Sequence, residues 1–170
     1  MKNLLKKQAL GAYLTLGALV LAIVGLILYG ATIAAGNGVQ VANGGEIYLQ
    51  AKDFGGVTVL GIFSVVFLLA GCLIGQLKLQ GIVGKVVDVV GYAFRVLAPV
   101  FLILTFVGFL NGTLTGLGWT FFSNEELEIY AAAKRAGTLN IVALVFFVLA
   151  FVVAIVSSFF KITKEEKVVE

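Results

Sequence analysis

The sequence predicts an all-α membrane protein: an antiparallel bundle of four transmembrane helices, with a small extracytoplasmic β-hairpin and a short outer helix leading into the fourth span. The chain has 170 residues, of which 61% are hydrophobic and only 12% charged, whereas a soluble chain is about half apolar and about a quarter charged. The apolar residues gather in four long runs, each near the ~20 residues that a helix needs to cross a bilayer core. Strands of a membrane barrel would instead alternate apolar and polar residues over about 10 positions.

The four predicted spans together form one domain. They cover approximately residues 9–35, 57–75, 86–118 and 138–160. Charge is absent from all but the third, whose start is blurred by two charged residues. The first run follows three lysines, as a secretory signal does, but the apolar part of a signal is only about 7–15 residues long. We therefore expect the first run to remain in the protein as a helix.

The basic residues predict the orientation of the chain. If both termini are cytoplasmic, nine of the twelve lysines and arginines lie inside, in agreement with the positive-inside rule. We therefore expect a multi-pass protein of the cell membrane with both termini in the cytoplasm. The net charge of +3 follows from this topology, and no basic patch with interleaved aromatic residues indicates a nucleic-acid surface. The expected partners are the lipid bilayer and either another membrane protein or further copies of this chain.

Small residues recur three or four positions apart along each span. In lipid, helices associate through close packing at such residues, because the hydrophobic effect does not drive one helix onto another. Two pairs with the Gly-x-x-x-Gly spacing are the candidate contact points: Gly71 with Gly75, and Gly108 with Gly112. These seams either pack the bundle itself or bind another subunit.

The inner connection, residues 76–95, is amphipathic. Its charged residues form one stripe on a helical wheel: Lys78, Lys85, Asp88 and Arg95. The segment either lies at the cytoplasmic interface or forms the inner end of the third span. An ionisable residue at membrane depth indicates function, although Arg95 can also extend its head group to the interface. Pro99 lacks a backbone N–H group, and we expect Thr105 or a water to satisfy the carbonyl that it frees.

The first outer loop, residues 36–56, predicts a β-hairpin. Alternating apolar and polar residues at 39–42 and 46–50 flank the turn sequence Asn43-Gly44-Gly45, and glycine supplies the left-handed turn position. An isolated hairpin is marginally stable in water, so we expect it to rest on the second outer loop or on a partner.

The second outer loop, residues 111–137, contains the predicted short helix. Ser123 or Asn124 can cap it, with Glu126 completing a capping box, and it either ends at Gly137 or continues into the fourth span. The outer-loop candidates for docking a partner are Tyr48, Trp119, Glu126, Tyr130 and Lys134.

The residue content argues against catalysis. There is no histidine and only one cysteine, and the chain contains no phosphate-binding loop, zinc-type spacing or Ser/His/Asp set. We therefore expect a non-enzymatic protein without catalytic, metal-binding or cofactor-binding residues. The expected function is that of a small accessory or scaffold subunit, which binds another membrane protein through its small-residue seams and structured outer loops. The alternative is an oligomeric channel or transporter for a small solute.

Overall fold

The computed structural model describes residues 9–42, 55–77, 79–122 and 130–162, and these residues form four long helices. The helices are α2 (Leu10–Ala42), α3 (Gly55–Ile74), α4 (Gly81–Phe122) and α5 (Tyr130–Ser158). Each is long and apolar enough to cross a membrane. The prediction of four helices that are long and apolar enough to cross a membrane is therefore confirmed.

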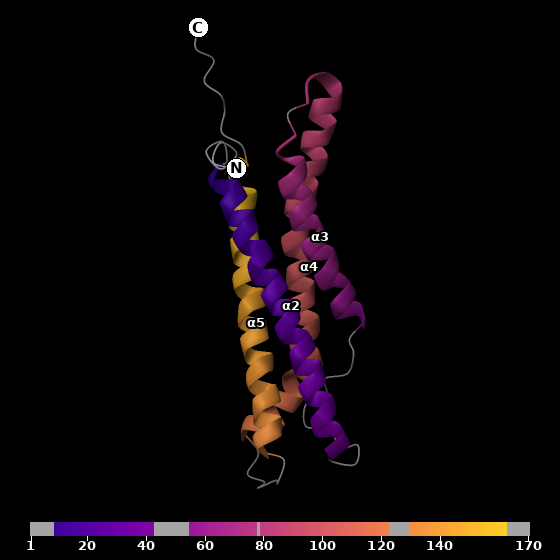
Figure 1. The fold of residues 1–170 in the computed structure, drawn as a ribbon, viewed down its shortest axis with the longest axis vertical. Helices are drawn as coiled ribbons and strands as arrows, with labels where there is room; N and C mark the ends of the chain where they lie inside the picture. Colours follow the sequence, from indigo (N-terminus) through magenta and orange to yellow (C-terminus); the bar gives the residue numbers. More distant parts are fainter. Residues whose placement is uncertain (1–8, 43–54, 78, 123–129, 163–170) are drawn as a thin grey trace.

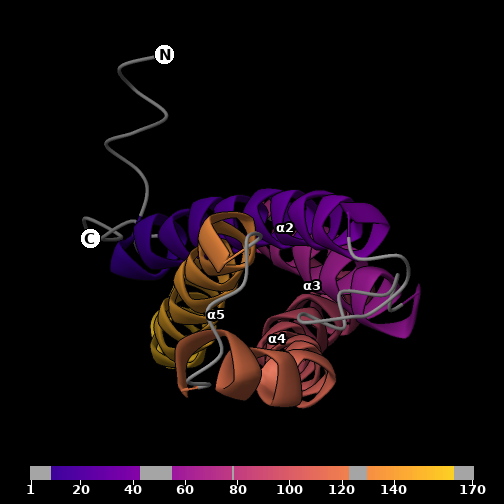
Figure 2. The same cartoon turned by 90° about the horizontal axis from the view of Figure 1, so that it is seen from below.

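The four helices surround a common axis in the order of the chain (Figure 2). Each helix packs on its two neighbours in the ring, and the contact between α2 and α5 is the most extensive. Glycine permits this close approach: a methyl group at Gly25 of α2 would lie 3.1 Å from the ring of Phe147 on α5. This contact joins the first helix, α2, to the last helix, α5, and so closes the bundle.

The helices are staggered along the bundle axis. With a rise of 1.5 Å per residue, the 42 residues of α4 extend over roughly 63 Å, about twice the thickness of a bilayer core. Arg95 of α4 bonds to carbonyls at the end of α5, so residues 81–94 lie beyond that end. Figure 1 shows the hairpin of α3 and α4 rising past the first residues of α2 and the last residues of α5.

The centre of the bundle is filled by large apolar side chains. Phe109 and Phe147 are completely buried, as is Leu102. The rings of Tyr29 and Phe109 meet edge to face with their centroids 4.8 Å apart, a favourable geometry for aromatic pairs.

Buried threonines satisfy their hydroxyl groups inside their own helices. Each donates to the carbonyl four residues earlier, as Thr113 does to Phe109 at 2.8 Å. The others are Thr15, Thr32, Thr105 and Thr120. This arrangement suits a membrane interior, where no water is present to pair with polar groups.

The predicted β-hairpin is not supported. Residues 39–42, its expected first strand, form the last turn of α2, and its turn and second strand lie outside the described residues. No strand occurs in the part of the chain that the structure describes. Extending an existing helix adds one hydrogen bond for each residue fixed, whereas a two-stranded hairpin is marginally stable by itself.

Large parts of the predicted second outer loop, residues 111–137, and of the inner connection, residues 76–95, are helical. Residues 111–122 continue α4, and α5 begins at Tyr130 and runs through Gly137 into the fourth span. The amphipathic segment is continuous with the third predicted span from Gly81 onward, as one helix, α4.

Candidate functional site

Arg95 ties α4 to the end of α5. Its side chain is only 6% exposed, and its Nη2 group donates hydrogen bonds to the carbonyls of Ser157 and, at 2.8 Å, Phe160. The last carbonyls of a helix lack intrahelical donors and carry a partial negative charge. The guanidinium therefore caps α5, and the helix end compensates part of its charge.

A second hydrogen bond between the same helices runs in the opposite direction. Pro99 has no N–H group, so it leaves the carbonyl of Arg95, four residues earlier, without its helical donor. The hydroxyl group of Ser158 donates to that carbonyl at 2.9 Å, and the carbonyl of Ala154 lies 3.0 Å from the same hydroxyl. Of the two donors that we expected for this carbonyl, Thr105 or a water, Thr105 bonds instead to the carbonyl of Phe101.

The start of α2 completes this end of the bundle. The N–H group of Ala9 donates to Ile162 at 2.8 Å, and that of Gly11 to Lys161 at 3.2 Å. A methyl group at Gly11 would lie 2.6 Å from the carbonyl oxygens of Phe160 and Lys161. The short segment after α5 thus accepts hydrogen bonds from both α2 and α4.

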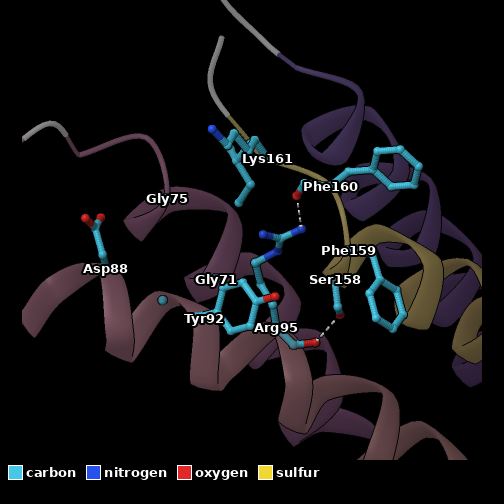
Figure 3. Close-up of a pocket in the computed structure, with 11 residues that line it drawn as sticks. Gly71, Gly75, Asp88, Tyr92, Arg95, Ser158, Phe159, Phe160 and Lys161 are labelled. Carbon is cyan, nitrogen blue, oxygen red and sulfur yellow. Dashed lines mark hydrogen bonds between the residues drawn. The ribbon is translucent and has the colours of Figure 1, made fainter. Parts of the chain in front are cut away.

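A cavity of about 500 Å³ opens beside Arg95, between α3, α4 and the segment after α5. Its polar lining consists of Asp88, Tyr92, Arg95, Ser158 and Lys161. Figure 3 shows Asp88 across the cavity from the other charged side chains. It also shows one guanidinium nitrogen meeting the Phe160 carbonyl, while another points away from it. The buried Nε atom of Arg95 has no hydrogen-bond partner among the described residues.

The predicted charge stripe is partly gathered in this cavity. Arg95 and Asp88 line it, whereas Lys85 is exposed on α4 outside it. Lys78 lies outside the described residues. Tyr92 extends the polar face of the helix, and its ring centroid lies 6.0 Å from Cζ of Arg95, within reach of a cation–π interaction.

Three of the four candidate glycines lie at contacts within the chain. A methyl group would lie 2.7 Å from Cγ of Arg95 at Gly71, 2.5 Å from Ile162 at Gly75, and 2.9 Å from Val57 at Gly108. Gly112 is half-buried on α4. These contacts favour packing of the bundle itself over the binding of another subunit through the same glycines.

Of the five outer-loop candidates, only Lys134 has a side chain that the structure describes. Tyr48 and Glu126 lie outside the described residues. Trp119 belongs to the last turn of α4 and Tyr130 begins α5, where Lys134 is exposed one turn later.

The sequence reasoning missed two polar groups. Ser158 is one of them, although Pro99 was a signal that a carbonyl one turn earlier needed another donor. The second is Asn140 on α5, which is 0% exposed and whose Oδ1 and Nδ2 atoms have no partner among the described residues. An amide in an uncharged apolar run was its only signal.

The residues that the structure describes define a class of fold: it is all-helical, with four helices suited to crossing a membrane. No protein-family model, curated protein or solved structure matches the chain. Within the described residues, no three His, Cys, Asp or Glu side chains are grouped closely enough to hold a metal ion. Function is therefore inferred from the chain's own surfaces and cavities.

Proposed function

We propose that this protein is a non-enzymatic accessory or scaffold subunit that binds a helix of another membrane protein. The contact surface is the apolar face of the first turns of α4. On this helix Ile82, Val86, Val89 and Ala93 are spaced four, three and four residues apart, so they share one face.

The exposure of that face is the observation that carries the proposal. Ile82 is 82% exposed and Val89 is 69% exposed, although both belong to a helix that is amphipathic in this region. The polar face, with Asp88 and Tyr92, is turned toward the cavity. An apolar stripe that the described part of the chain leaves uncovered, beyond the ends of α2 and α5, is typical of a surface that docks a partner helix.

The packing of the bundle centre favours this function over a pore in a single chain. Phe109, Phe147 and Leu102 are completely buried at the centre, and the buried threonine hydroxyls bond to backbone carbonyls. A water-filled path needs polar groups or charges that face a lumen. An accessory role needs only a closed bundle and an exposed docking face.

Purification in mild detergent, with mass spectrometry of co-eluting proteins, tests the proposal. A Val89→Gln variant places an amide on the apolar face, while the matched control Lys85→Gln places the same group one turn earlier, at a position that is already polar. We expect a stoichiometric partner to be lost from Val89→Gln and kept by Lys85→Gln. Elution of the wild-type chain alone, together with solute flux through liposomes that contain only this chain, would contradict the proposal and favour the oligomeric channel.

A further inference from the structure

We propose that the cavity beside Arg95 binds the phosphate group of an anionic phospholipid in the adjacent membrane leaflet. Basic pockets between transmembrane helices are a known means of holding acidic lipid head groups. Here the pocket is built by three separate parts of the chain: α3, the inner end of α4, and the segment after α5.

Arg95 has hydrogen-bond donors left for a ligand. Both of its hydrogen bonds to the end of α5 come from Nη2, and its buried Nε is unpaired among the described residues. A guanidinium has five N–H donors in a planar fork that fits two phosphate oxygens. An unpaired buried N–H of a charged group is costly, so a phosphate oxygen that accepts from it relieves this cost.

The charges of the cavity match one phosphodiester. Arg95 and Lys161 each carry a positive charge and Asp88 a negative one, which leaves one positive charge in excess among these three lining residues. A phospholipid phosphodiester carries a single negative charge. Asp88 lies across the cavity from the two cations (Figure 3), so it lowers their attraction for an anion without occupying their side of the site.

The position of the cavity favours a lipid over a soluble phosphate compound. It lies where the uncharged run of α5 ends at Phe160 and the first cation, Lys161, follows. This transition marks the level of the lipid head groups. Gly71 of α3 and Gly75, just after its end, form one wall, and their lack of side chains lets Arg95 and Ile162 pack close to the backbone there.

Native mass spectrometry of the full chain released from nanodiscs tests this assignment. The nanodiscs contain phosphatidylcholine with or without phosphatidylglycerol, and the readout is the fraction of protein that retains a phosphatidylglycerol molecule. The Lys161→Gln variant removes one cation of the cavity without removing the Arg95 cap. Lys85→Gln is the matched control, because it removes one exposed cation at the same end of the bundle but outside the cavity. Asp88→Asn removes the opposing charge.

We expect wild-type protein to retain phosphatidylglycerol in preference to phosphatidylcholine. Lys161→Gln should weaken retention about fivefold, which corresponds to ~1 kcal/mol for one cation near a membrane surface. Lys85→Gln should change it little, and Asp88→Asn should strengthen it. Equal losses in Lys161→Gln and Lys85→Gln would overturn the proposal, because they would show attraction to the general surface potential. Glycerol phosphate that displaces the lipid at equal concentration would overturn the lipid assignment in favour of a soluble phosphate ligand.

Discussion

The bond between Ser158 and the carbonyl of Arg95 gives a prediction in which one residue decides the effect of another. In the wild-type helix, Pro99 cannot donate to that carbonyl, and Ser158 donates to it at 2.9 Å. Ser158→Ala therefore leaves a buried carbonyl unpaired, which in proteins generally costs about 1–3 kcal/mol. Hydrogen bonds between membrane helices average only ~0.6 kcal/mol. We expect the free energy of unfolding to fall by about 1–2 kcal/mol.

The Pro99→Ala background should remove this effect. An alanine at position 99 restores the N–H group that a helix directs to the carbonyl four residues earlier, so the carbonyl of Arg95 no longer depends on Ser158. In that background we expect Ser158→Ala to change the free energy of unfolding by less than about 0.5 kcal/mol. The coupling energy between the two positions should thus be about 1 kcal/mol or more.

Reversible unfolding in mixed micelles, with increasing sodium dodecyl sulfate and helicity followed by circular dichroism, measures all four chains of the cycle. Ser157→Ala is the matched control: its hydroxyl group donates to Ala154 within α5 at 2.8 Å, so its loss should have the same effect in both backgrounds. If Ser158→Ala lowered stability equally with proline and with alanine at position 99, the proposed link between the two residues would be wrong.

Four further substitutions test the packing by the same unfolding measurement. Gly11→Ala should lower stability by about 1–3 kcal/mol, because the methyl group would lie 2.6 Å from the carbonyl oxygen of Phe160. Gly17→Ala, which meets no atom within 4 Å, should be neutral or stabilising by up to about 1 kcal/mol, and equal losses at the two glycines would contradict this. Phe147→Ala should lower stability by about 3–5 kcal/mol, and a loss below about 1 kcal/mol would show that the centre is loosely packed. Asn140→Leu should be neutral or stabilising, because the amide is buried without a partner among the described residues; a large loss would reveal a bound water or another partner.

The spans were predictable because each apolar run is long enough to cross a bilayer core, a requirement that few other structures impose on a sequence. The ends of the helices were not. Residues 39–42 alternate like a strand, and residues 111–122 are rich in glycine and aromatic residues, yet both continue helices. Local composition is a weak guide at such positions, because each residue added to a helix gains a hydrogen bond whatever its side chain.

Only the residues that α4 contributes to the candidate site could be predicted from the sequence. A helical wheel places Arg95 and Asp88 on the same stripe, and both line the cavity. The groups that complete the site come from the end of α5, more than 60 residues away along the chain. Pro99 indicates that the carbonyl of Arg95 needs a donor, but nothing in the local sequence indicates that Ser158 supplies it. Contacts of this range depend on how the bundle closes.

The geometry also explains how the charged side chain of Arg95 is accommodated next to the end of α5 without an ion pair to a carboxylate of the described residues. The carbonyls that Arg95 meets belong to Ser157, in the last turn of α5, and to Phe160, just after it, and the C-terminal end of a helix dipole is equivalent to about half a negative charge. That partial charge compensates the charge of the guanidinium only in part. The N–H groups of the guanidinium other than those of Nη2 stay available for another acceptor. An aspartate in direct contact would have neutralised the arginine and occupied the same donors. Capping by a helix end therefore lets one residue join α4 to α5 while the remaining guanidinium donors stay available for the phosphate that we propose.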